Sequence, residues 1–330
     1  MCIRSFLSSS LVGLVLPLVT AVGCEHDPAS SSSDAAVPAT LERAGAGGVA
    51  GVPGARGGGL VPLGSGYRWT YQGGVVFQEP GEPFQIPRVE THTIIGTESR
   101  SGRDYWLLEQ VIEEHVFGGD REIVNWSRLR QDRTGLFVAD VSVIEPPAGL
   151  SVAAEPCADA LAEAAWERMA GSLRDSERAA YRRAWEELAA RRDALRSLVR
   201  LAASTVAATG LGRDPGGVAA GELTRLSYPL HPGAEWVIRE EPLFRCRVEA
   251  VDVLALPIGR VPAYRTRIEG VFFDADDDVF FWYGHVGFVG QSVHTETVAT
   301  DPDGNPIGTL IADDTLFLTS VTLGTPGGLH

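Results

Sequence analysis

The sequence predicts a mainly β fold, an antiparallel curved sheet or open barrel in two related halves, with an inserted α-helical hairpin. Three observations lead to this fold class. Apolar and polar residues alternate in short segments on both sides of a central region, as in half-buried strands. The central region, residues 158–209, changes to a helical period. A short turn motif occurs once in each β region.

The composition is that of a folded protein and argues against nucleic-acid binding. The chain has 330 residues, 44% of them hydrophobic and 22% charged, which is enough to bury a substantial core. Its net charge is −15, and all 28 basic residues are arginine. Because a phosphate backbone requires clustered positive charge, we expect no nucleic-acid partner.

Residues 1–23 are predicted to be a signal peptide. Arg4 precedes an apolar stretch, residues 6–19, that is too short to cross about 30 Å of hydrocarbon. The next segment, Ala21-Val22-Gly23-Cys24, resembles the lipobox of bacterial lipoproteins, in which small residues precede an acylated cysteine. The alternative is an ordinary signal peptide cleaved after Gly23.

The lipobox resemblance implies a location as well as a modification. Cys24 would carry acyl chains such as palmitate and would anchor an exported protein to a membrane of the cell envelope. The expected membrane is the outer one, with the protein facing the periplasm or the cell surface. Residues 24–61 are rich in Ser, Ala, Gly and Pro, and we expect this lipidated segment to be a flexible linker.

Residues 62–157 form the first predicted β half. Tyr67, Trp69 and Tyr71 share one face of a strand, and further alternating segments cover residues 89–95, 105–116, 122–130 and 135–144. Turn residues separate these segments at short intervals. This spacing predicts an antiparallel meander.

The insertion, residues 158–209, contains one glycine, no proline and many strong helix formers. Apolar residues form a stripe at helical spacing along it. Gly171, Ser172 and Asp175 should divide it into a short and a long helix, with Ser172 or Asp175 as the N-cap.

Residues 210–330 form the second predicted β half. Strand patterns cover residues 222–228, 235–240, 243–254, 261–273, 279–289, 291–300 and 307–323. The sequence D-P-D-G-N at residues 301–305 predicts a hairpin turn between the last two strands.

The two β halves share a repeated motif, P-L-x-x-G-x-x-W, at residues 62–69 and 229–236. This motif, together with the segments at 133–138, 257–259 and 282–289, resembles a group of uncharacterised secreted bacterial lipoproteins. The resemblance covers residues 60–144 and 222–323. More remotely, the layout is similar to the half-barrel carriers of the LolA and LolB type, which hold an acyl chain between a curved sheet and covering helices.

Cysteine positions agree with export. Cys2 would be removed with the signal peptide and Cys24 acylated, which leaves Cys157 and Cys246. In an oxidising compartment these two could form a disulfide. The alternative is a pair of buried free thiols.

The sequence contains no recognisable catalytic or cofactor motif. Asp274, Asp276 and Asp278 resemble the start of a calcium loop, but Val279 and His285 stand where such a loop needs Gly and Glu. We therefore interpret these aspartates as an acidic hairpin tip and expect no bound metal or cofactor. Zinc-site spacing and the G-x-S-x-G serine motif are also missing, so we expect a non-enzymatic protein.

Two functions remain after these exclusions. The first is a scaffold or interaction protein of the envelope, bound to the membrane through Cys24 and to another envelope protein. We favour this function, because aromatic residues on strands usually pack in a core and do not usually line a ligand site. The alternative is a carrier that holds a lipid or other apolar ligand between curved sheet and helices. A cavity between sheet and helices would favour the carrier. The aromatic residues that would fill the core or line the ligand site are Trp69, Trp106, Trp126 and Trp236.

Overall fold

The computed structural model describes residues 40–42, 61–78, 82–100, 102–116, 119–139, 165–200, 222–240, 243–271, 273–274 and 276–324. All of them belong to one compact unit, residues 36–330. The predicted signal peptide, the lipidation site Cys24 and Cys157 lie outside the described residues. Export, lipidation and the disulfide therefore stay predictions.

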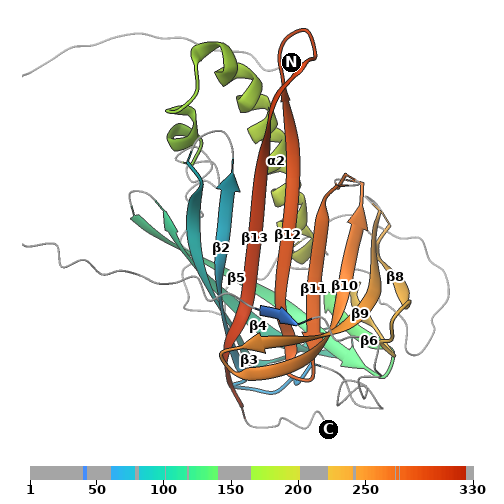
Figure 1. Ribbon diagram of the computed structural model, residues 1–330. Helices are drawn as coiled ribbons and strands as arrows, with labels where there is room; N and C mark the ends of the chain where they lie inside the picture. The colour runs from blue at the N-terminus through green and yellow to red at the C-terminus, as the bar shows by residue number, and fades with distance from the viewer. Residues whose placement is uncertain are drawn as a thin grey trace, which may run out of the picture. The chain divides into compact units, whose positions relative to one another are not determined.

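Within the described part of the chain, thirteen strands form one antiparallel sheet (Figure 1). Its order is β1-β9-β10-β11-β12-β13-β2-β3-β4-β5-β6-β7, and β8 pairs with β9 beside this path. The strands are β1 (Thr40–Glu42), β2 (Arg68–Gln78), β3 (Phe84–Arg100), β4 (Arg103–Val116), β5 (Gly119–Asp132), β6 (Gly135–Ala139), β7 (Glu222–Ser227), β8 (Glu235–Arg239), β9 (Phe244–Leu256), β10 (Gly259–Gly270), β11 (Asp278–Gly284), β12 (Gly287–Thr300) and β13 (Pro306–Thr322).

The sheet curls into a nearly closed barrel. β7 at one end of the strand order lies beside β8, which pairs with β9 near the other end. β13 pairs with β2, so the last strand of the chain joins the two halves side by side. The predicted fold class, an antiparallel barrel-like sheet with a helical insertion, is confirmed.

One predicted strand and part of the predicted linker differ from the structure. The alternating segment at residues 279–289 is two strands, β11 and β12, which reverse at His285 and Val286 before Gly287 with φ of 101°. Because apolar residues continue through this tight turn, their alternation hid it. In the predicted linker, β1 pairs with β9.

The repeated motif builds the same turn twice. Gly66 and Gly233 have φ of 82° and 89°, a conformation that favours glycine. The amide of Gly66 donates to the carbonyl of Ile94 at 2.8 Å, and the amide of Gly233 donates to that of Val248 at 2.7 Å. Each copy therefore ties a turn to a neighbouring long strand.

The insertion contains a short helix at residues 165–170 and the long helix α2 (Asp175–Arg200). The expected N-cap is wrong: the hydroxyl of Ser172 donates to Met169 O at 2.8 Å, at the end of the short helix. The carboxylate of Glu177 accepts from the backbone N–H of Arg174 at 3.2 Å, as in a capping box. The predicted apolar stripe is confirmed where its side chains are described, because Ala165, Met169, Leu173, Tyr181, Trp185 and Leu188 are all buried.

Two hydrophobic clusters fill the unit, and we name them by position. The barrel cluster contains Trp69, Ile94, Leu316 and Leu318 with many residues of β9–β12. The helix cluster packs α2 and residues 165–173 against the far ends of β2, β3, β12 and β13. The ring centres of Phe77 and Trp185, for example, lie 4.9 Å apart. Since these four strands pass from one cluster to the other, their middle sections lie between the clusters.

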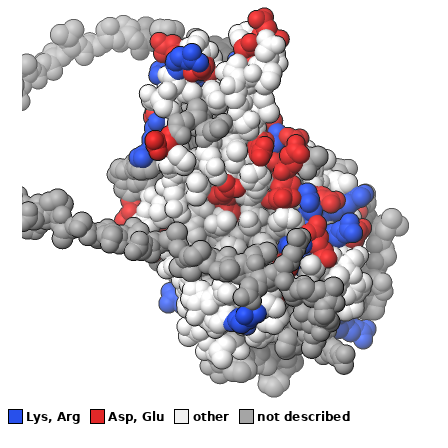
Figure 2. Space-filling model, viewed as in Figure 1, with Lys and Arg blue, Asp and Glu red and all other residues white. Residues whose placement is uncertain are grey.

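Acidic and basic side chains lie close together on the face shown in Figure 2. Figure 2 shows carboxylates at the tip of the β12–β13 hairpin, which carries the half-buried Asp301 and the exposed Asp303, and arginines intermingled with carboxylates across the middle of this face. In the described part of the chain, no helix is both long enough and apolar enough to cross a membrane.

Candidate ligand-binding cavity

A cavity of about 190 Å³ lies inside the curved sheet, against the middle sections of the long strands. This volume is far above the roughly 10–15 Å³ that one water molecule needs. The wall comes from ten strands, β2–β8 and β11–β13, together with Val61. Ala312 belongs both to the wall and to the helix cluster, which places that cluster at one end of the cavity.

Most of the wall is apolar. Alternate residues of β4 and β5, such as Leu108, Ile112 and Ile123, point into the cavity because side chains of a strand alternate between its faces. Phe281 and Phe288 contribute aromatic surface from β11 and β12. An apolar ligand could bury its surface against this wall.

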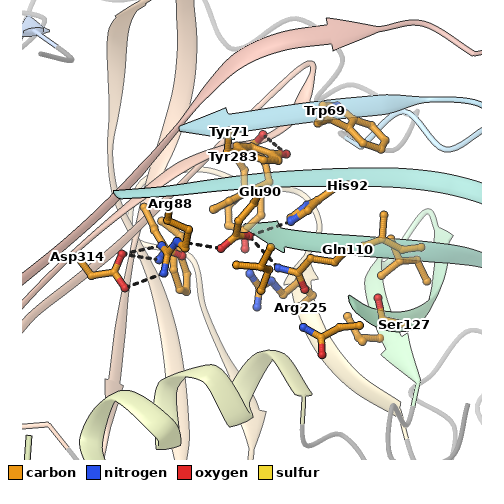
Figure 3. A pocket seen from close by; sticks show the side chains of 18 of the residues that line it. Trp69, Tyr71, Arg88, Glu90, His92, Gln110, Ser127, Arg225, Tyr283 and Asp314 are labelled. Carbon is orange, nitrogen blue, oxygen red and sulfur yellow. Dashed lines mark hydrogen bonds and ion pairs between the residues drawn. The ribbon is translucent and has the colours of Figure 1, made fainter. Parts of the chain in front are cut away.

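A charged network crosses one side of the cavity (Figure 3). The guanidinium of Arg88 donates to both carboxylate oxygens of Asp314, at 2.7 and 3.2 Å. Its Nε lies 3.2 Å from the carboxylate of Glu90. The other oxygen of Glu90 accepts from Gln110 at 2.8 Å and lies 3.1 Å from Nε2 of His92.

The network keeps buried charges ionised. Burial disfavours the charged form of Arg88, but the carboxylates of Asp314, Glu90 and Glu114 overcome this and raise its pKa. Burial alone would raise the pKa of Glu90, but Arg88 and the hydrogen bonds from His92 and Gln110 lower it to about 2. The pairing in this wall is therefore stable over the physiological pH range.

Trp69, Tyr71 and Tyr283 belong to the barrel cluster and line the cavity. The hydroxyl of Tyr71 donates to the carbonyl of Phe288 at 3.2 Å, and the indole N–H of Trp69 donates to that of Val286 at 2.7 Å. Burial, followed by the charge of Glu90, raises the pKa of Tyr71. These hydrogen bonds tie β2 to the β11–β12 turn and to the start of β12.

Arg225 is the second arginine of the wall. Leu136 of β6 pairs with Leu226 and Phe137 pairs with Thr224, so Arg225 is the additional residue of a β-bulge. Its guanidinium carbon lies 5.1 Å from the ring centre of Phe281 and 5.9 Å from that of Tyr283. Within the described residues it forms no ion pair with a carboxylate.

The four tryptophans named from the sequence occupy different environments. Trp69 and Trp126 line the cavity. Trp106 is buried in the barrel cluster away from the cavity wall, and Trp236 is half-buried against the same cluster. The structure thus brings only two of the four to the candidate site.

The other named residues lie elsewhere. Cys246 is buried, and burial raises the pKa of its thiol to about 12; its predicted partner Cys157 lies outside the described residues. Asp274 contacts Arg191 at 2.6 Å and Asp278 contacts Arg267 at 3.2 Å, while Asp276 is exposed. Among the described residues, no group of three or more His, Cys, Asp or Glu could hold a metal ion.

Sequence reasoning missed the polar side of the cavity. Arg88, Glu90 and His92 alternate with outward residues between the buried Ile86 and Ile94. Charged residues at inward positions of a strand are costly unless they are paired, so this pattern was a readable signal. Arg225 gave no such signal, because it stands between Leu223 and Leu226, two apolar residues that plain alternation would place on opposite faces.

Comparisons with known proteins provide no family for this chain. No family model matches the sequence, and no curated protein matches it. Among solved structures, a crystal structure described as a candidate lipoprotein of Parabacteroides distasonis matches over 80% of this chain and 98% of its own length. The sequence identity is 8% and the TM-score is 0.29, so this likeness supports no conclusion about the fold or function of the chain.

Proposed function

We propose that this protein is an exported, membrane-anchored binding protein that holds a small, largely apolar ligand inside its curved sheet. The observation that carries the proposal is the cavity of about 190 Å³, with an apolar wall and a few ordered polar groups, between the two hydrophobic clusters. A scaffold needs no such space, because close packing of the same aromatic residues would stabilise it better.

The polar network supports a binding function, because burying charged side chains costs free energy that a purely structural role does not explain. Replacing a buried ion pair by packed apolar residues is often neutral or stabilising, so such pairs are weak evidence for a purely structural role. Here Arg88, Glu90 and Asp314 hold ordered polar groups at the edge of an apolar space. This combination is typical of sites that bind one end of a ligand by hydrogen bonds and the rest by apolar contact.

Binding can be measured with N-phenyl-1-naphthylamine, a neutral apolar dye that fluoresces when it is bound. Replacing Leu108→Trp should fill part of the cavity and weaken dye binding at least about tenfold, which is about 1.4 kcal/mol. Leu107→Trp is the matched control, because Leu107 is the neighbouring residue on β4 and points to the other face. A folded Leu108→Trp variant that binds the dye as the wild type does would contradict the proposal.

The natural ligand and the anchor need separate experiments. Native mass spectrometry of protein purified from its own envelope should show a bound small molecule, and a mass equal to the acylated polypeptide alone would favour the scaffold. Cys24→Ala should release the protein from the membrane fraction, since acyl chains contribute about 0.8 kcal/mol per buried CH₂. Unchanged membrane partition would exclude lipidation as the anchor.

A further inference from the structure

We infer that the cavity selects an apolar ligand that carries one carboxylate, and that Arg225 binds this carboxylate. The inference rests on the proposed function and specifies the class of ligand. It follows from the position of Arg225, from the partners of the other charged residues in the wall and from the surfaces around its guanidinium.

The backbone directs Arg225 into the cavity. β6 and β7 pair in register on both sides of this residue, and the register shifts by one where it is inserted. Bulges are frequent next to functional sites, where they redirect a single side chain. Without the bulge, Leu223 and Arg225 could not both face the cavity while Leu226 is buried in the barrel cluster.

The other charged groups of the wall are engaged with each other. Asp314 accepts two hydrogen bonds from Arg88, and Glu90 is held by Arg88, His92 and Gln110. The field of Glu114 acts on Arg88 as well. These groups form one cluster around Arg88, and Arg225 does not share in its ion pairs.

Arg225 has donors to spare for a ligand. A guanidinium has five N–H donors, and among the described residues its contacts are the hydroxyl of Tyr283 and the faces of two aromatic rings. Figure 3 shows it among the side chains of the cavity, without an ion pair to any residue drawn. The position of the guanidinium near the rings of Phe281 and Tyr283 restricts its motion, so fewer orientations of its donors must be lost when a ligand binds.

The chemistry of the surroundings favours a carboxylate on an apolar body. A planar carboxylate matches the guanidinium fork and can accept two parallel hydrogen bonds. Leu136, Leu223 and Ile238 line the same cavity and offer apolar contact to the remainder of the ligand. The net charge of −15 repels anions at long range, but salt screens exposed charges beyond about 10 Å at 0.1 M, so the local contact decides selectivity.

The test compares three ligands with the same chain and different head groups: decanoate, decanol and decyltrimethylammonium. Their affinities for the full mature protein are measured at neutral pH by displacement of N-phenyl-1-naphthylamine. In the wild type, decanoate should bind at least about tenfold more tightly than decanol, the ratio expected for a charge-assisted pair. Arg225→Gln should remove this preference while changing decanol affinity less than about twofold. Arg245→Gln is the matched control, because Arg245 is exposed on β9.

The outcomes separate the two proposals. If none of the three ligands displaces the dye from the wild type, the proposed function fails. If decanol or decyltrimethylammonium binds as well as decanoate, or if Arg225→Gln keeps the preference, the role of Arg225 is wrong while the binding function stands. Should Arg225→Gln not fold by near-ultraviolet circular dichroism, Arg225→Lys replaces it. Since lysine keeps the charge but not the fork, the preference should then fall and remain above one.

Discussion

Replacing Arg88→Met removes the cation of the cavity network and leaves two carboxylates buried without it. Arg88 and Glu90 are only 5% and 8% exposed in their side chains, and Arg88 bonds Asp314 at 2.7 Å. Removing one partner of a buried pair costs about 3–5 kcal/mol, because the remaining charge is poorly solvated. We expect the free energy of unfolding to fall by this amount at neutral pH.

The shifted pKa of Glu90 gives a magnitude from a different observation. Its pKa is lowered from 4.5 to about 2 in the folded protein. This difference corresponds to about 3 kcal/mol of stability, present above the pKa of the unfolded chain and lost as the pH falls toward 2. Without Arg88, burial would instead raise the pKa of Glu90, so the variant should lose stability as the pH rises above about 4.3.

Urea unfolding followed by tryptophan fluorescence at about pH 4 and about pH 7 tests this reasoning. The deficit of Arg88→Met should be smaller at the lower pH, where the buried carboxyl groups can protonate. Arg245→Met is the control for loss of an exposed arginine, with an effect within about 0.5 kcal/mol. A deficit of less than about 1 kcal/mol for Arg88→Met, or one that is equal at both pH values, would refute the account of the network.

Three further perturbations test other parts of the structure. Trp69→Ala should lower the free energy of unfolding in urea by about 3–5 kcal/mol, because Trp69 is 4% exposed. Trp236→Ala should lower it by less than about 2 kcal/mol, because Trp236 is half-buried. Equal losses would contradict these environments. His294 lies 2.6 Å from Asp313 and 2.9 Å from Glu296, and although burial lowers its pKa, these hydrogen bonds raise it above 6.5 overall. The stability that these contacts contribute is present below the pKa of the unfolded chain and is lost as the pH rises through the pKa of the folded protein. His294→Gln should therefore lose more free energy of unfolding at about pH 6 than at about pH 9. A loss independent of pH would refute this assignment. A Cβ at Gly73 would lie 1.9 Å from the backbone oxygen of Thr315, so Gly73→Ala should lower the melting temperature through about 1–3 kcal/mol of overpacking, whereas Gly96→Ala, with nothing within 4 Å, should leave it nearly unchanged.

The sequence determined the local elements of this protein. Alternation of apolar and polar residues located most strands, since the pleat sends successive side chains to opposite faces. Helical spacing located the insertion and its buried stripe, including Met169 and Trp185. The repeated motif located two equivalent turns, because a glycine with positive φ has few substitutes, and Gly66 and Gly233 both adopt that conformation.

The tertiary structure decided the candidate site. Arg88 and Asp314 are 226 residues apart in sequence and meet only because β13 pairs with β2, which pairs with β3. Arg225 faces the cavity two residues after Leu223, and the bulge at Arg225 lets Leu226 turn inward as well, toward the barrel cluster. Periodicity along the chain reports which face of a strand is apolar, but not which strands become neighbours or where packing leaves space. The cavity depends on the closure of the sheet and on the position of the helix cluster, which are long-range contacts that no local pattern contains.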